Sequence, residues 1–130
     1  MRKELDDQLC REFPNLYRDR RASMMETLMC WGFCVGDGWF NIIYDMSKKL
    51  EALILEMPEK ERQNYKAVQI KEKFGGLRVY LFSETKEMEE IISEAEKLCD
   101  ITCEKCGAEG RFRSKGWCIV LCDNCDNQTK

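Results

Sequence analysis

The chain has 130 residues, of which 44% are hydrophobic, and it carries a formal net charge of −3 without a single histidine. This length suits one domain with at most a small appendage, and the apolar fraction allows a packed core, which excludes wholesale disorder. The net charge excludes a protein that binds duplex nucleic acid over its whole surface. The lack of histidine removes the commonest general base and the commonest metal ligand.

Two absences set the expected compartment. No run of about 18 apolar residues could cross a membrane, and the charged N-terminus lacks the apolar stretch of a secretory signal. We therefore expect a cytoplasmic protein without a membrane partner, in a compartment where thiols stay reduced. There, the nine cysteines indicate metal binding before disulfides.

The N-terminal third gives one clear element. Apolar residues spaced by four predict a helix over 3–13, which Pro14 ends. The apolar residues at 24, 25, 28 and 29 could form a short buried helix. The glycine-rich stretch 30–40 predicts a tight loop packed by its own aromatic side chains.

The middle of the chain is more regular. Apolar spacings of three and four predict an amphipathic helix over 39–57, which Pro58 ends. Alternating residues on both sides of a Gly-Gly pair predict a β-hairpin over 66–83. A second amphipathic pattern predicts a helix over 85–99. The expected fold is therefore α+β.

A four-cysteine pattern closes the chain. The pairs Cys103-x2-Cys106 and Cys122-x2-Cys125 can each turn two thiolates inward, and two such knuckles make a tetrahedral zinc site. The residues between them predict the two strands of a zinc ribbon. We expect one structural zinc ion per chain, because four protein ligands leave no open position. Four unligated buried cysteines, or a redox dithiol, are the alternatives.

These elements predict two parts. Residues 1–101 would form an α+β core, with a small helical layer on a short antiparallel sheet, and residues 102–130 a zinc-ribbon module packed on it. Cys99 and Cys118 fit core packing. Cys30, Cys34 and Cys10 could belong to a second metal site only with further ligands.

The hairpin is the candidate binding surface. The segment 66–83 is locally basic although the protein is acidic, and its bare Gly-Gly turn could admit a phosphate. Arg78 would be a bidentate partner, and Tyr80 or Phe82 a stacking face. A solvated strand face with alternating charge is the competing interpretation. The predicted ligand-binding residues are Lys71, Lys73, Arg78, Tyr80 and Trp39.

The loop before the second helix also merits attention. Gly36-Asp37-Gly38, opening a helix, is similar to an anion cradle. The carboxylate of Asp37 argues against that function, because it would occupy the amides and repel an anion. Tryptophans such as Trp39 are more often core residues than ligand platforms.

The order of these motifs resembles a known family. The strings GDGWF at 36–40 and VQIKEKFGGLR at 68–78, followed by the four-cysteine pattern, are similar to small, mostly uncharacterised proteins of bacteria, prophages and phages. The resemblance spans roughly residues 28–126. It implies a mobile-element setting, in which small proteins often inhibit host defences or sequester nucleotide signals.

Three classes of function follow. The first is a non-enzymatic binding protein of phage type, which would use the basic hairpin and the 31–39 loop to hold a host protein or a small anionic or nucleotide ligand. The second is a nucleic-acid-binding zinc ribbon, with Arg111, Arg113 and Lys115 at its tip. The third is a small hydrolase-type enzyme. It would depend on groups from the set Asp37, Glu72 and Cys34.

Overall fold

The computed structural model describes residues 1–23, 25, 27–114 and 116–128. Its architecture is mixed α+β, which confirms the predicted fold class. The α-helices are α1 (Lys3–Glu12), α2 (Phe40–Leu55), α3 (Lys86–Cys99) and α4 (Asp123–Gln128). Short 3-10 helices are η1 (Met29–Trp31), η2 (Asp37–Trp39) and η3 (Glu59–Asn64). The strands are β1 (Phe33–Cys34), β2 (Ala67–Lys73), β3 (Gly76–Leu81), β4 (Arg111–Ser114) and β5 (Cys118–Leu121).

The main sheet has the strand order β1-β2-β3. Strands β2 and β3 form the predicted antiparallel hairpin, and β1 adds a parallel edge, with Phe33 opposite Ile70. The hairpin closes through Phe74 and Gly75, which have φ angles of 54° and 83°. Two successive positive φ angles define the two-residue turn that best matches the twist of a hairpin. The edge strand was not predicted, because two residues carry no readable periodicity.

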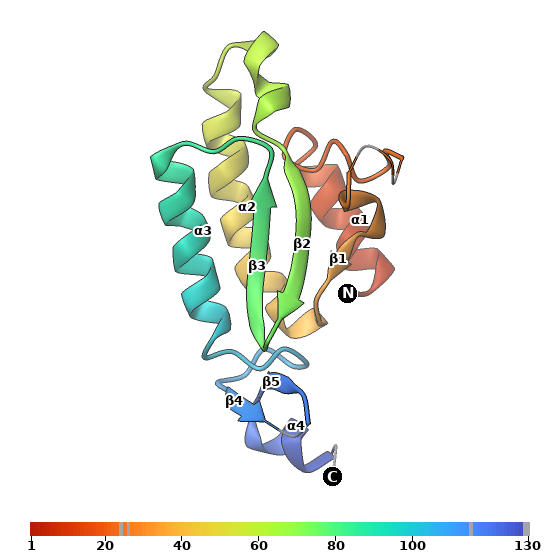
Figure 1. The fold of residues 1–130 in the computed structure, drawn as a ribbon, viewed down its shortest axis with the longest axis vertical. Helices are drawn as coiled ribbons and strands as arrows, with labels where there is room; N and C mark the ends of the chain where they lie inside the picture. Colours follow the sequence, from red (N-terminus) through yellow and green to blue (C-terminus); the bar gives the residue numbers. More distant parts are fainter. Residues whose placement is uncertain (24, 26, 115, 129–130) are drawn as a thin grey trace.

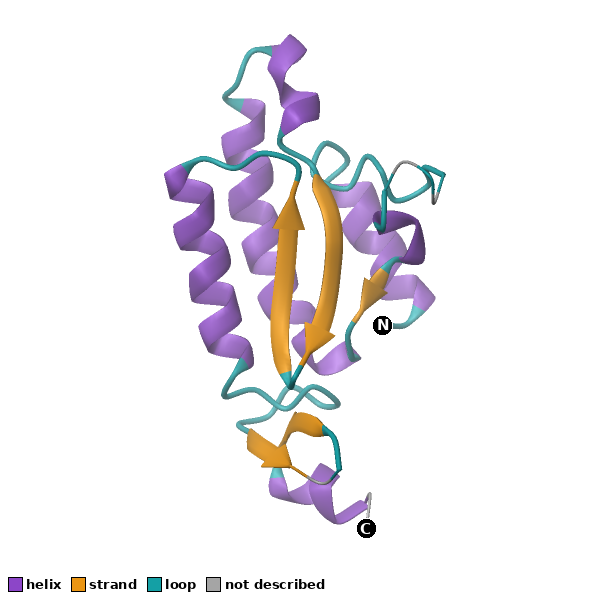
Figure 2. Ribbon diagram, viewed as in Figure 1, coloured by secondary structure: helices purple, strands orange, loops and turns teal. Residues whose placement is uncertain are grey.

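The helices cover one face of this sheet. Figures 1 and 2 show α2 behind β2 and β3, α3 beside β3 and α1 behind β1, while no helix of the described residues covers the face of β2 and β3 toward the viewer. The covered face supplies Ile70, Leu77 and Val79 to the main core, where they meet helix residues such as Ile43 and Leu50. The sheet is therefore two-sided, with one apolar face and one open face.

The C-terminal module lies at the turn end of the hairpin (Figure 1). It contains the antiparallel pair β4–β5 and the short helix α4. Its buried residues Cys103, Leu121 and Cys125 form a cluster of their own, separate from the main core. The division at residue 102 stays a prediction, and these two clusters agree with it.

The boundaries of the three long helices lie close to the predicted ranges, but the segment 24–29 differs from its prediction. No short buried helix forms among its described residues: Met25 is 88% exposed, Leu28 is half-exposed, and of the described apolar residues only Met29 is buried, in η1. Met24 lies outside the described residues. Apolar residue type alone gave that prediction, without a helical period long enough to support it.

The 30–40 stretch is also more ordered than a loop, because it contains η1, β1 and η2.

Within the described ranges, no helix combines the length and the apolar character that crossing a bilayer would need.

Candidate metal centre and binding surface

The four predicted cysteines come together. Cys103 and Cys106 lie in the loop after α3, Cys122 follows β5, and Cys125 lies in α4. Their sulfur atoms all lie within 4.8 Å of one another, and the Sγ atoms of Cys106 and Cys122 are 3.6 Å apart. Sulfur atoms in a tetrahedral centre with bonds of about 2.3 Å would be roughly 3.8 Å apart. The cluster could therefore hold a metal ion.

Backbone amides prepare this cluster for negative charge. Burial acts to raise the pKa of Cys103, but main-chain N–H groups of Cys122, Cys106 and Lys105 outweigh it and lower that pKa to about 6. Hydrogen bonds to a thiolate favour the charged form, which is the form that binds metals. The Cys125 N–H also donates to the Cys122 sulfur at 3.4 Å. The backbone therefore favours the thiolate at Cys103, whereas a hydrogen bond with the Cys122 thiol, followed by burial, raises the pKa of Cys125 to about 12.

Gly107 completes the first knuckle, directly after Cys106. Its φ angle is 84°, in the left-handed region that favours glycine. Its N–H donates to the Cys103 carbonyl at 2.9 Å. The turn therefore brings the chain sharply back past the first ligand.

The other cysteines are used elsewhere. Among the described residues, the four-cysteine cluster is the one group of three or more potential ligands. The Cys10 thiol faces Asp6 Oδ1 at 3.6 Å, and Cys30 faces the Thr27 carbonyl at 3.4 Å. Burial, with the nearby Asp6 charge, raises the pKa of Cys10 to about 12. No second metal site forms from Cys10, Cys30 and Cys34 within these residues.

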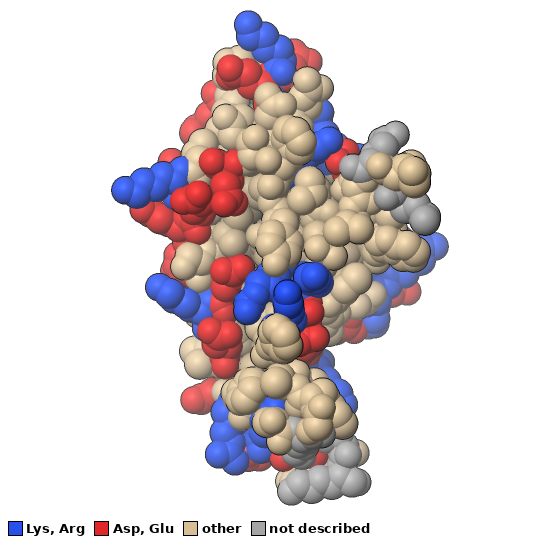
Figure 3. Space-filling model, viewed as in Figure 1, with Lys and Arg blue, Asp and Glu red and all other residues tan. Residues whose placement is uncertain are grey.

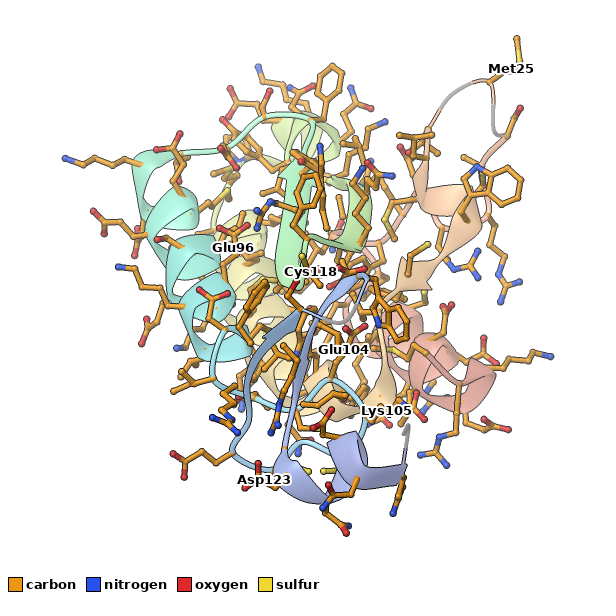
Figure 4. All side chains as sticks on the ribbon, turned by 60° about the horizontal axis from the view of Figure 1, so that its bottom comes forward. Met25, Glu96, Glu104, Lys105, Cys118 and Asp123 are labelled. Carbon is orange, nitrogen blue, oxygen red and sulfur yellow. The ribbon has the colours of Figure 1, made fainter. Side chains whose placement is uncertain are left out.

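The amides of the 36–38 loop are occupied by the protein itself, as predicted, but the occupant is Glu104 and not Asp37. The Gly36 N–H donates to Glu104 Oε2 at 2.9 Å, and the Gly38 N–H donates to the Glu104 carbonyl at 2.8 Å. Asp37 instead pairs with Arg2, whose Nε lies 2.9 Å from Oδ2. Figure 4 shows Glu104 where the C-terminal module meets the core. The glycines form a seat for the first metal knuckle.

Close packing explains why this seat contains glycines. A Cβ atom on Gly38 would lie 2.2 Å from the Cys103 carbonyl oxygen and 2.6 Å from the Gly107 nitrogen. A Cβ atom on Gly36 would lie 2.4 Å from the Glu104 carbonyl oxygen. All three contacts are with backbone, which cannot rotate away. The glycine motif is readable in the sequence, but its partner is not, because the two segments are far apart in the chain.

The prediction that Trp39 binds a ligand is wrong. Its side chain is 0% exposed in the main core. Its indole N–H donates to the Thr102 carbonyl at 2.8 Å, which satisfies the polar end inside the protein. Because no part of the ring reaches the surface, Trp39 supports the seat and does not contact a ligand.

The other four predicted binding residues share the open face of the sheet. Lys71 lies opposite Arg78, and Gln69 opposite Tyr80. Lys73 follows Lys71 by two positions on β2 and therefore points to the same side. Their neighbours Ile70 and Val79 are buried on the covered face. The period of two predicted this grouping, although Gln69 was not among the predicted residues.

Among the described residues, these cations form no close ion pairs. Within residues 1–23, 25, 27–114 and 116–128, no carboxylate oxygen lies within 4.0 Å of the charged groups of Lys71, Lys73 or Arg78. Burial raises the pKa of Glu96 on α3, and the nearby positive charge of Arg78 partly offsets this rise. Figure 3 shows a basic group low on the sheet face, with largely uncharged surface above and below it and acidic groups beside it.

A groove runs beside this group. It encloses about 430 Å³ and has Lys71 and Tyr80 in its wall. The remaining lining residues come from β2 and from the segment before η1: Val68, Gln69, Thr27 and Leu28. Apolar side chains next to a cation fit a ligand that has both a flat apolar part and a negative charge.

The ribbon arginines predicted to bind nucleic acid already have acidic partners within the protein. The Arg113 guanidinium donates to Asp126 Oδ2 at 2.9 Å, to Asp123 Oδ1 at 2.8 Å and to the Leu121 carbonyl at 3.0 Å. It therefore fastens α4 to the ribbon. Arg111 is exposed and lies 3.7 Å from Asp123. Lys115 lies outside the described residues.

The residues proposed for enzymatic chemistry have local roles. Glu72 Oε2 accepts a hydrogen bond from the Gly75 N–H at 2.6 Å and so supports the hairpin turn. Asp37 is paired with Arg2, and the Cys34 thiol faces the Trp31 carbonyl at 3.8 Å.

Comparisons of the chain with protein-family models, with curated proteins and with solved structures find no significant match. The resemblance to small phage and bacterial proteins therefore stays a prediction.

Proposed function

We propose that this chain is a non-enzymatic binding protein, that a structural zinc ion fixes its C-terminal module, and that the open sheet face binds an anionic ligand. One observation carries the proposal: Lys71 and Arg78 stand directly opposite each other on neighbouring strands, with Lys73 beside them. Like charges placed opposite each other destabilise a hairpin. An anion bound between them would remove that repulsion.

The choice of zinc rests on the donor set. Four cysteine sulfurs in a tetrahedral arrangement suit zinc, and four protein ligands fill its coordination shell. Such an ion supplies folding energy to a small module and performs no chemistry on a substrate. The residues that would hold it are Cys103, Cys106, Cys122 and Cys125.

The biological setting belongs to the same proposal. A cytoplasmic protein of phage type could use this face to sequester a small nucleotide or to contact an acidic surface of a host defence protein. The basic sheet face and its groove support an anionic ligand of either kind. Within the described residues, no observation favours the ribbon tip or an enzymatic site over this face.

An NMR titration tests the proposal with tripolyphosphate, an anion that has no base or sugar. We expect amide shifts concentrated at residues 69–80, weakening as salt is raised. A variant with Lys71→Gln, Lys73→Gln and Arg78→Gln should lose these shifts.

The matched control removes three exposed cations elsewhere, through Lys48→Gln, Lys49→Gln and Lys60→Gln, and it should keep the shifts of the unmodified protein. If shifts were scattered over the surface, or equal in both variants, the sheet face would not be an anion site.

A further inference from the structure

The open face carries aromatic rings as well as cations. Arg78, Tyr80 and Phe82 follow one another at intervals of two, so their side chains point to the same side. The Phe82 N–H donates to the Lys66 carbonyl at 2.8 Å, which shows that the pairing with the β2 side continues beyond β3. Tyr80 is 43% exposed and Phe82 is 63% exposed. Both rings are therefore accessible from solvent.

Each accessible ring has a cation beside it. The Lys66 ammonium lies 5.5 Å from the centroid of the Phe82 ring, and the Lys73 ammonium lies 5.6 Å from that of Phe74. Tyr80 shares its groove with Lys71. Rings that alternate with cations match a polymer in which bases alternate with phosphates.

Phe74 is an unusual residue for its position. It has a φ angle of 54° in a turn where asparagine and glycine are preferred, and its side chain is 72% exposed. Neither the backbone nor burial explains a phenylalanine there. Next to it, the exposed Phe112 would lie 3.3 Å from a Cβ atom on Gly75. The aromatic surface therefore continues from the sheet onto the ribbon.

We infer that the ligand of this face is a single-stranded nucleic acid. This inference rests on the proposed anion site and names its ligand class. Bases stack on Tyr80, Phe82 and Phe74, and the phosphates lie along Lys71, Lys73 and Arg78. Stacking on exposed rings needs unpaired bases, so a duplex cannot make these contacts.

The length of the surface distinguishes a strand from a free nucleotide. Strand β3 has six residues, which extend about 20 Å at roughly 3.3 Å per residue. Phe82 and Phe74 lie beyond its opposite ends, and a single nucleotide cannot reach both. Acidic groups flank the basic group in Figure 3, so the path of the strand runs between these flanks, along β2 and β3.

The test is fluorescence anisotropy of the zinc-loaded full chain with a labelled oligothymidylate about 12 nucleotides long, within the site sizes of such surfaces. We expect saturable binding at about 50 mM salt, with a log–log salt slope of about −2 for three phosphate contacts. Tyr80→Ser combined with Phe82→Ser should weaken binding by at least about fivefold per ring. The same variant should keep its tripolyphosphate shifts.

A matched control removes exposed apolar side chains elsewhere, through Leu55→Ser and Leu98→Ser, and it should bind like the unmodified protein. Circular dichroism of every variant checks that the fold is retained.

Three competitors identify the source of the signal: an abasic oligomer, a duplex of equal length, and ATP. Equal competition by the abasic oligomer, or unchanged binding by the aromatic variant, would overturn the inference and leave the anion site standing. Equal competition by the duplex or by ATP would also overturn it, in favour of those ligands. If tripolyphosphate and the oligonucleotide both fail to bind, the proposed function fails as well.

Discussion

The indole N–H of Trp39 donates to the main-chain carbonyl of Thr102 at 2.8 Å, across the boundary between the core and the cysteine module. Trp39 is the largest fully buried side chain of the core, and Thr102 directly precedes Cys103, the first residue of the cysteine cluster. The Gly38 N–H makes a parallel contact with the Glu104 carbonyl. The position of the first knuckle and the packing of the core therefore depend on each other.

The first prediction concerns the glycine seat. Gly38→Ala places a Cβ atom 2.2 Å from the Cys103 carbonyl oxygen, so the knuckle must move away from the core. Overpacking of this kind costs about 1–3 kcal/mol, and the contact with backbone puts this case at the upper end. We expect a lower midpoint in urea unfolding together with weaker zinc retention against a chelator.

Gly76→Ala is the control for that substitution. Its Cβ atom would lie 2.9 Å from the Arg78 guanidinium, a flexible group that can swing aside, and at an ordinary contact distance of 3.7 Å from Asp100 Oδ1. If Gly38→Ala proved as stable as Gly76→Ala, the close seat between the core and the knuckle would not exist.

The second prediction follows metal removal with Trp39 as the reporter. Trp31 and Trp117 are mostly exposed, whereas Trp39 is buried. In a variant carrying Trp31→Phe and Trp117→Phe, emission comes from Trp39 alone. We expect a chelator to shift this emission to longer wavelength, because loss of the ion frees Thr102 and lets water reach the indole.

Cysteine variants calibrate this experiment. Cys122→Ser should move the Trp39 emission close to the wavelength measured with the chelator, since it removes one of the four cysteines. Cys118→Ser, outside the cluster, should keep the emission and about one zinc per chain. If the Trp39 spectrum did not change after complete zinc removal, the metal would have no effect on the packing of the core around Trp39.

Sequence patterns predicted what depends on near neighbours along the chain. The helices, the hairpin and both cysteine knuckles follow from local periodicity and spacing. The contact of Gly36 with Glu104 and the parallel pairing of Phe33 with Ile70 join segments that are far apart along the chain. Trp39 shows the same limit, because residue type suits both a ligand platform and a core, and only the fold decides its exposure.

Glu51 is a further residue that no local pattern could identify, and it gives the third prediction. Its buried carboxylate accepts hydrogen bonds from the Leu16 N–H at 2.8 Å and from the Asn15 side-chain amide at 2.8 Å. Glu51→Ala leaves the buried Leu16 donor without its acceptor, which costs about 1–3 kcal/mol. Chemical denaturation measures the loss.

Glu56→Ala, at the exposed end of the same helix, is the comparison and should change stability by less than about 0.5 kcal/mol. Equal losses for the two variants would show that Glu51 acts only through its contribution to the helix.

The last prediction is a dependence on pH. The Tyr44 hydroxyl donates to Glu12 Oε1 at 2.6 Å and joins α2 to α1. This bond, followed by one from Gln8, holds the pKa of Glu12 below its ordinary value of 4.5. The folded protein therefore binds fewer protons at Glu12 than the unfolded chain. The resulting stability is present above pH 4.5 and is lost as pH falls through the lower folded pKa.

The same bond raises the pKa of Tyr44 above its ordinary value of 10. At alkaline pH, the stability that this bond contributes is present below pH 10 and is lost as pH rises through the folded pKa of Tyr44. Glu12→Gln should therefore lower the melting temperature most at neutral pH, with the difference from the unmodified protein narrowing in acid and in strong base. A difference that stayed constant from pH 3 to pH 7 would mean that the ionised form of Glu12 contributes nothing to the contact between α1 and α2.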